Sequence, residues 1–245
     1  MWGCEVARQI TFGSLFAGIG GFDLGFERAG MRCVWQVEID PFCQKVLAKH
    51  WPDVRRWDDV RTFPPEPTED WTCDVICGGF PCQDISNAHT NGRRRGIGGE
   101  RSGLWVEFFR VVRVVRPRWV VVENSPAWQR WTAAVCEDLH GLGYCPTPLE
   151  LEAAAVGAPH ARPRVFVVAH ANGNSESPCP FDEEAPGLPP PASLGRHWRG
   201  TLPGPVGVAD GVSSEVVLRA YGNAVVPQVA EWIGRRIVEV VDPTL

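Results

Sequence analysis

Short apolar runs rich in β-branched residues alternate along this chain with segments of helical periodicity. The runs begin near Ile10 and recur at 33–37, 75–77, 119–122 and 165–168. Continuous runs of this kind are typical of strands that are buried on both faces of a sheet. Asp40-Pro41 opens one helical pattern, and Ser102 opens another that Pro117 stops. This alternation predicts right-handed crossovers and an α/β fold, a doubly wound, mostly parallel sheet with helices on both faces.

The periodic pattern lapses in the last third of the chain. From Asn172 to about Gly207 the sequence is rich in Gly, Pro, Ser and Glu, and it includes Pro186-Gly-Leu-Pro-Pro-Pro. Such a stretch does not form a conventional core element. Regular patterns return at 216–218 and in a helix expected from Pro227 through Val240. We therefore expect a core over residues 1–171, an irregular segment over 172–214, and a C-terminal part over 215–245 that returns to the core.

Candidate catalytic and cofactor-binding residues lie where three of the expected strands end. The first run leads into the glycine-rich segment Phe16-Ala-Gly-Ile-Gly-Gly, and the run from Asp74 ends in Gly78-Gly-Phe-Pro-Cys82. A third run ends in Glu123-Asn124. In open α/β sheets, ligands bind beyond the carboxyl ends of the strands. The sequence therefore predicts a cofactor loop, a thiol and a carboxylate at one edge of the sheet.

The glycine-rich loop matches the dinucleotide fingerprint GxGxxG only in part, because Asp23 stands at the third glycine position. Glu38 ends the second run about 20 residues after the glycines, where a carboxylate accepts ribose hydroxyls. Asp59, beyond a short third segment, is placed to meet an adenine amine. Each carboxylate alone is compatible with an ordinary surface position. Together they indicate a nucleotide-type cofactor.

The order of these motifs, from Phe16 to the C-terminal Gly222-Asn-Ala-Val-Val-Pro, resembles that of the DNA cytosine-5 methyltransferase family. The resemblance implies a Rossmann-like, S-adenosylmethionine-dependent methyltransferase sheet, with S-adenosyl-L-methionine as cofactor and double-stranded DNA as partner. The positions that the resemblance assigns to the cofactor pocket are Phe16, Gly18, Gly20, Glu38, Asp59, Phe80, Leu104, Asn223 and Val225.

The resemblance also implies methylation at C5 of a cytosine that has been flipped out of the helix. Because C5 is a poor nucleophile, a thiolate must first attack C6, and Cys82 is the expected attacker. Glu123 is expected to hydrogen-bond or protonate N3, with a pKa that burial would raise. Arg162 and Arg164 match the arginines of a further family motif, in which Arg164 would contact cytosine O2. The expected catalytic residues are thus Cys82, Glu123, Arg162 and Arg164.

Two of the motifs depart from the family pattern. Ser125 follows Glu-Asn where the family usually has Val, which is a packing position. Pro159-His-Ala-Arg-Pro-Arg replaces the pattern Gln-Arg-Arg-Glu-Arg. We therefore expect weaker polar support of the two retained arginines.

The region between the arginine motif and the C-terminal Asn motif is short. It runs from Val165 to Tyr221, about 57 residues, so the segment 172–214 reads as a reduced target-recognition region. An aromatic and basic patch at Arg196, Trp198 and Arg199 could contact DNA or be surface packing. Sequence specificity is otherwise expected from the loop that contains Gly92-Arg-Arg-Arg, or from a separate specificity or restriction partner.

Composition narrows the class of protein. A net charge of −5 argues against a protein that coats nucleic acid, although 22 of the 24 basic residues are Arg, the better partner for phosphates and base edges. The nine cysteines form no CxxC pair and have no His at zinc-ligand spacing, so we expect reduced thiols and no metal. The chain has neither an apolar run of about 20 residues nor a signal-peptide pattern, which predicts a cytoplasmic protein without a membrane partner.

Three alternatives remain open from the sequence. A related branch of the same family methylates cytosine in tRNA with the same residues. A catalytically weak regulatory module would keep the cofactor pocket, which intact Cys82 and Glu123 oppose. A nicotinamide-dependent oxidoreductase is disfavoured by the broken glycine fingerprint and by the Pro81-Cys82 motif.

Overall fold

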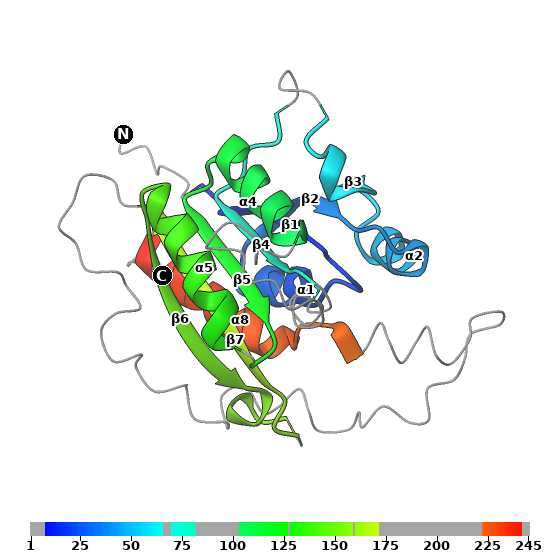
Figure 1. Cartoon of the computed structure of the whole chain (residues 1–245). Coiled ribbons are helices and arrows are strands. Elements are labelled where there is room, and N and C mark those ends of the chain that lie inside the picture. Colours follow the sequence, from blue (N-terminus) through cyan, green and yellow to red (C-terminus); the bar gives the residue numbers. More distant parts are fainter. Residues whose placement is uncertain are drawn as a thin grey trace, which may run out of the picture.

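The computed structural model describes residues 8–65, 70–81, 103–126, 128–158, 160–171 and 222–241. Seven strands form one sheet in the order β3-β2-β1-β4-β5-β7-β6 (Figure 1). Neighbouring strands among β1 to β5 are parallel, whereas β7 is antiparallel to both β5 and β6. The strands are β1 (Thr11–Leu15), β2 (Arg32–Val37), β3 (Arg55–Trp57), β4 (Val75–Gly79), β5 (Trp119–Asn124), β6 (Tyr144–Glu152) and β7 (Pro163–Ala171).

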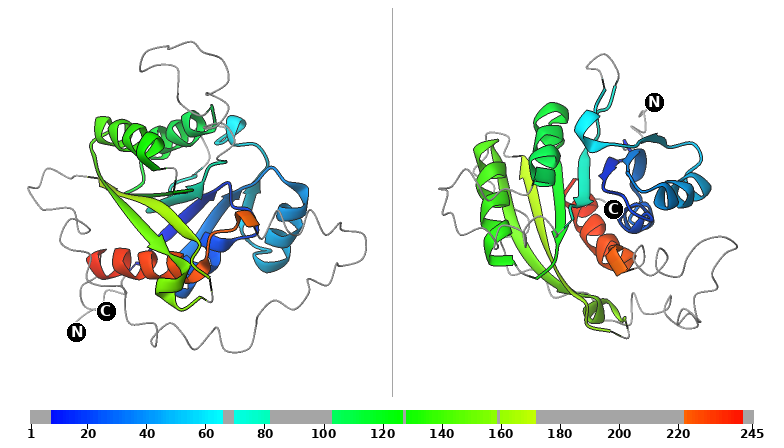
Figure 2. Two further views of the ribbon diagram at one scale, coloured as in Figure 1. Left: turned by 60° about the horizontal axis from the view of Figure 1, so that its bottom comes forward. Right: turned by 45° about the vertical axis from the view of Figure 1, so that its right-hand side comes forward.

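Helices cover both faces of this sheet, which confirms the doubly wound α/β prediction. Residues of α4 and α5 pack on one face, and residues of α1 and α8 pack on the other (Figures 1 and 2). The α-helices are α1 (Gly21–Arg28), α2 (Pro41–His50), α4 (Gly103–Val115), α5 (Trp128–Gly141) and α8 (Pro227–Val241). Among the described residues, the short 3₁₀ helix η1 (Val60–Thr62) lies between β3 and β4, and η3 (Ala153–Val156) lies between β6 and β7.

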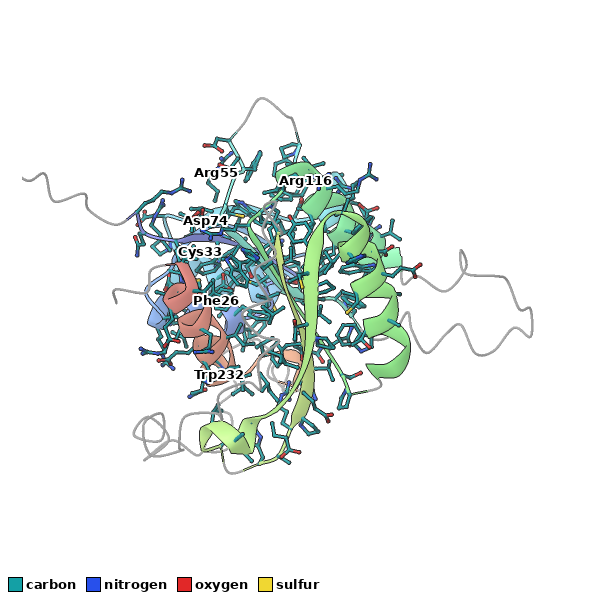
Figure 3. All side chains as sticks on the ribbon, turned by 90° about the vertical axis from the view of Figure 1, so that its left-hand side faces the viewer. Phe26, Cys33, Arg55, Asp74, Arg116 and Trp232 are labelled. Atoms are coloured by element: carbon teal, nitrogen blue, oxygen red, sulfur yellow. The ribbon has the colours of Figure 1, made fainter. Side chains whose placement is uncertain are left out.

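The core consists of two apolar layers with the sheet between them. Alternate residues of β5 enter opposite layers: Val120 and Val122 face α4 and α5, whereas Val121 faces α1 and α8. Phe26 of α1 and Trp232 of α8, both labelled in Figure 3, belong to the second layer. Because both faces are buried, these strands read as uninterrupted apolar runs in the sequence.

Local signals explain where the predicted helices begin. The carboxylate of Asp40 accepts hydrogen bonds from the backbone N–H of Phe42 at 2.8 Å and of Cys43 at 3.2 Å, and Pro41 occupies the first helical position of α2. Helix α8 begins at Pro227, as predicted. Helix α4 begins at Gly103, while Ser102 lies outside the described residues.

The sheet differs from the prediction at its β6 edge. The sequence predicts a strand at 165–168, but β7 is longer and antiparallel, and β6 was not anticipated. Pro146 and Pro148 interrupt the apolar pattern of β6, and proline is tolerated there because an edge strand needs fewer backbone donors. The predicted elements at 172–214 and 216–218 lie outside the described residues. Within the part of the chain that the structure describes, no helix is both long and apolar enough to cross a membrane.

Candidate active site at the strand ends

The loop after β1 is held by the carboxylate that ends β2. The backbone N–H of Gly18 donates to Glu38 Oε2 at 2.7 Å, and that of Asp40 donates to Glu38 Oε1 at 2.8 Å. Burial raises the pKa of Glu38, while these two hydrogen bonds oppose the rise. Each carboxylate oxygen still has a lone pair available. Glu38 can therefore fix the glycine loop and accept ribose hydroxyls as well.

The glycine loop itself turns sharply into α1. Phe16, Gly18 and Gly20 all have positive φ angles, of 51°, 58° and 87°. The Phe16 ring stacks on Phe108 of α4 with the ring centroids 6.5 Å apart. Phe16, Gly18 and Gly20 thus lie at the carboxyl end of β1, where the sequence predicted a cofactor loop.

Asp59 follows β3 at the same edge of the sheet. Its carboxylate accepts a hydrogen bond from the backbone N–H of Arg61 at 3.0 Å, and its side chain is 31% exposed. Arg110 of α4 holds the next turn, because its Nη2 donates to the carbonyls of Val60 at 2.6 Å and Phe63 at 2.7 Å. The role of Arg110 depends on these tertiary partners and has no signal in the sequence.

Ile39, directly after Glu38, was also missed by the sequence analysis. The residue is 59% exposed, the most of the large hydrophobic residues that the structure describes as exposed. An apolar residue that follows the carboxylate at the end of β2 was the signal that could have identified it. An exposed apolar side chain next to a carboxylate that is expected to accept ribose hydroxyls suits contact with a nucleoside base.

Glu123, the second-to-last residue of β5, is almost fully buried, with 8% of the residue exposed. Arg164 Nε lies 3.0 Å from Glu123 Oε1. Gly79 of β4 leaves room for the carboxylate, since a Cβ at position 79 would lie only 2.6 Å from Glu123 Oε2. Burial raises the pKa of Glu123 to about 7, against the opposing charges of Arg164 and Arg162. Both protonation states are therefore populated near neutral pH, as proton donation in a catalytic cycle requires.

The strand end that leads to the expected nucleophile is fastened to β5. Cys82 lies outside the described residues, which reach Pro81 in this part of the chain. Asn124 Nδ2 donates to the Phe80 carbonyl at 3.0 Å. The Phe80 ring lies 5.8 Å from that of Trp105 and 5.9 Å from that of Trp131. The backbone two residues before Cys82 is thus tied to the residue next to Glu123.

Four of the cysteines that the structure describes lack the properties of a nucleophile. Burial raises the pKa values of the Cys33, Cys73, Cys77 and Cys136 thiols. A thiol with a raised pKa carries little thiolate near neutral pH.

Arg162 and Arg164 point to different parts of the site. Arg162 Nη2 donates to the carbonyls of Gly222 at 2.7 Å and Ala224 at 2.8 Å. Arg164 contacts Glu123 and also donates from Nη1 to the Pro163 carbonyl at 2.8 Å. Main-chain carbonyls and Glu123 thus provide polar support in place of the side chains that the sequence lacks relative to the family pattern.

The C-terminal segment lies beside the glycine loop. The carbonyl oxygen of Val225 approaches Gly21, the first residue of α1, so closely that a Cβ on Gly21 would collide with it. The Val225 side chain packs against the α1 and α8 layer, whereas Asn223 is exposed. Leu104, at the start of α4, packs against the opposite apolar layer.

A buried polar cluster beneath the loop was not anticipated from the sequence. The fully buried carboxylate of Asp23 accepts hydrogen bonds from Gln36 Nε2 at 2.8 Å and Ser14 Oγ at 3.1 Å, and Cys33 Sγ lies 3.5 Å away. Burial raises the pKa of Asp23 to about 6, against the opposing effect of these hydrogen bonds. The residue that breaks the glycine fingerprint therefore joins α1 to β1 and β2.

Among the described residues, no group of three or more His, Cys, Asp or Glu side chains could hold a metal ion.

The family model for C-5 cytosine-specific DNA methylase matches residues 10–193. The chain belongs to this family. The match begins just before β1 and includes the strand ends that carry the glycine loop, Glu123 and Arg164.

Curated relatives agree with this assignment. The type II methyltransferase M2.BsuMI of Bacillus subtilis (strain 168) is 35% identical over 165 residues, which cover 64% of this chain and 41% of the relative. The type II methyltransferase M.HhaI of Haemophilus parahaemolyticus is 29% identical over 191 residues, which cover 71% of this chain and 55% of the relative. The chain thus spans about half the length of the curated relatives it matches.

Solved structures show the same fold. A chain encoded within an Escherichia coli prophage and described as a DNA modification methyltransferase gives a TM-score of 0.54 at 26% identity, covering 66% of this chain and 47% of that chain. A mutant of Spodoptera frugiperda DNMT2 gives a TM-score of 0.57 at 19% identity, covering 70% and 52%. The second likeness extends to the fold alone.

Proposed function

We propose that this chain transfers a methyl group from S-adenosylmethionine to C5 of cytosine in double-stranded DNA. The observation that carries the proposal is the buried Glu123 with a pKa of about 7, paired with Arg164 at 3.0 Å. This pair lies beside the strand end that continues through Phe80 and Pro81 to Cys82. A proton donor and a cation, beside a strand end from which the chain continues to a thiol, suit covalent activation of a pyrimidine.

The residues at the ends of β1, β2 and β3 fit a nucleoside cofactor that carries no phosphate. Glu38 would accept the ribose hydroxyls, Asp59 the adenine amine, and Ile39 would contact the base. We assign Phe16, Gly18, Gly20, Phe80, Leu104, Asn223 and Val225 to the walls of the same pocket. When bound there, S-adenosylmethionine supplies a methyl group that is activated by its positive sulfonium.

The chain's own residues would activate the flipped cytosine. Arg164 would hold O2, while protonated Glu123 would donate its proton to N3. The Cys82 thiolate would then form a bond to C6, and the electron pair displaced from the C5–C6 bond would make C5 nucleophilic. After C5 has been methylated, loss of the C5 proton to solvent would expel the thiolate and restore the aromatic ring. N3 would return its proton to Glu123.

We further propose that specificity comes from residues 172–214, from the arginine-rich loop at 92–95, or from a separate specificity or restriction partner. The motivation is that the chain spans only 41% of M2.BsuMI and 55% of M.HhaI. We place the reaction in the cytoplasm, since the cysteines that the structure describes are free thiols.

The proposed function is tested by trapping the covalent adduct. Purified protein is incubated with tritiated S-adenosylmethionine and, separately, with unmethylated DNA, total RNA, or DNA that contains 5-fluorocytosine, whose C5 fluorine blocks release of the enzyme. We expect a denaturation-resistant adduct with the wild type and none with Cys82→Ser. Cys136→Ser, at a half-buried thiol of α5, is the matched control and should retain the adduct.

Two results would contradict the proposal. Label that enters total RNA but no DNA would replace the DNA substrate with RNA. Absence of label in every nucleic acid, with the cofactor still bound, would favour a regulatory binding module.

A further inference from the structure

Arg162 connects two parts of the sheet edge. The proposed function assigns one part, with Glu123 and Arg164, to the flipped base, and the other part, with the glycine loop, to the cofactor. Arg162 directly precedes β7 and has a φ of 39°, which is unusual for a residue other than glycine. Its Nη2 donates to the Gly222 and Ala224 carbonyls, which are 60 and 62 residues further along the chain. One guanidinium nitrogen therefore holds the main chain on both sides of Asn223.

The segment that Arg162 holds contacts the start of α1 through Val225. The Val225 carbonyl lies against Gly21, which follows the glycine loop and begins α1. The segment 222–225 is thus confined between the guanidinium of Arg162 and the first turn of α1. A displacement of this segment would move the wall next to the glycine loop.

The neighbouring arginine, Arg164, has a different partner. Arg164 pairs with Glu123, whereas both hydrogen bonds found for Arg162 lead to the C-terminal segment. Arg162 Nε is buried and has no hydrogen-bond partner among the described residues. Among the described residues, the two Nη2 hydrogen bonds to the Gly222 and Ala224 carbonyls are therefore the ones that hold the Arg162 side chain.

We propose that Arg162 is a positioning residue for the cofactor site. Arg162 fixes residues 222–225 against α1, and cofactor affinity therefore depends on this side chain. The other arginine of the same motif, Arg164, would instead hold the flipped cytosine. The proposal rests on the proposed function in that the ligand of this pocket is S-adenosylmethionine or its product.

The test is the binding of S-adenosylhomocysteine, measured by isothermal titration calorimetry without any turnover. Loss of the charged hydrogen bonds in Arg162→Ala should weaken binding by about tenfold. Arg162→Lys keeps the charge and part of the donor set, so its loss should be about threefold. Arg164→Ala should leave the binding constant within about twofold while it slows methyl transfer at saturating cofactor.

Arg235→Ala is the matched control, because Arg235 is an exposed arginine of α8 that pairs with Glu231 at 2.7 Å. It should bind S-adenosylhomocysteine as the wild type does. All titrations are made well below the thermal midpoint of each variant, so that loss of global stability does not enter the binding constant. Hydrogen exchange of residues 222–226 should be faster in Arg162→Ala without ligand, which a role confined to the base would not cause.

The outcomes separate the two proposals. If the wild type binds S-adenosylhomocysteine and Arg162→Ala binds it equally well, the positioning role is overturned while the proposed function stands. If Arg162→Ala does not fold, Arg162→Lys decides the question by the same comparison. A wild type that binds no S-adenosylhomocysteine would overturn the proposed function and, with it, this role for Arg162.

Discussion

The carboxyl group of Glu123 shows how one residue acquires its chemistry from its neighbours. Gly79 provides the space beside Oε2, and Arg164 pairs with Oε1 at 3.0 Å. Burial outweighs both arginine charges and raises the pKa of Glu123 to about 7. An exposed carboxylate would be ionised at that pH and could donate no proton.

The pH dependence of a single turnover tests this assignment. Ionisation of Cys82 should produce a rising limb, and deprotonation of Glu123 should produce a falling limb that begins near pH 7. Glu123→Gln can still donate a hydrogen bond but cannot transfer a proton. We expect this variant to be slower by roughly 10²–10⁴-fold and to lack the falling limb. A falling limb that persists in Glu123→Gln would assign that ionisation to another group.

At the level of elements, the glycine-loop end of the sheet depends on how closely α1 and α8 pack. A Cβ on Gly25 of α1 would collide with the carbonyl oxygen of Pro227 and with the side chain of Ala230. The first of these contacts is to backbone at the start of α8, which cannot move aside as a flexible side chain would. The pair of helices therefore relies on glycine at this position.

Gly25→Ala should lower the free energy of unfolding by about 1–3 kcal/mol, because overpacking forces the backbone to shift. Urea unfolding followed by tryptophan fluorescence measures the change. Gly141→Ala is the control, since a Cβ on Gly141, at the end of α5, would meet nothing within 4 Å. A Gly25→Ala variant as stable as Gly141→Ala would show that α8 adjusts freely against α1.

Elements with local signals could be predicted from the sequence. Asp40-Pro41 and Pro227 mark helix starts, and apolar runs mark the buried strands and the order of their functional ends. Strand β6 could not be identified, because Pro146 and Pro148 break its pattern and its edge position appears only in the assembled sheet. The antiparallel direction of β7 depends on that missed strand.

The sequence could predict those candidate site residues whose place follows from the local pattern, such as a position at the end of a strand. Glu38 directly follows β2 and Glu123 is the second-to-last residue of β5, so both lie at the carboxyl ends of strands. The contacts of Arg162, Arg110 and Asp23 are different, because each is defined by partners that are distant in sequence. Only the folded chain shows which carbonyls and side chains these residues hold.

At the level of the whole molecule, two buried carboxyl groups make stability depend on pH. The pKa of Asp23 rises from 3.8 to about 6, and that of Glu123 from 4.5 to about 7. A raised pKa means that the folded state favours the protonated group. The resulting stabilisation is complete below the unfolded-state pKa and is lost as the pH rises through the folded-state pKa. Both groups therefore make the protein less stable as the pH rises from about 4 to about 7.

Asp23→Asn tests the contribution of the more deeply buried of the two carboxyl groups, because Asp23 is fully buried. The neutral amide does not ionise. The variant should therefore not show the loss of stability that ionisation of Asp23 causes in the wild type between about pH 4 and pH 6. Relative to the wild type, its free energy of unfolding should rise across this range by up to about 3 kcal/mol, the equivalent of the shift in pKa. Urea unfolding at pH 4, 5, 6, 7 and 8 provides the comparison.

Asp53→Asn removes one negative charge from an exposed position and is the control for the change in net charge. A difference between Asp23→Asn and the wild type that stays constant with pH would mean that Asp23 remains ionised in the folded protein. Its hydrogen bonds from Ser14 and Gln36 would then outweigh the cost of burial. A difference that grows toward pH 6 would instead show that the junction of α1, β1 and β2 beneath the glycine loop contains a carboxyl group that is protonated in mild acid.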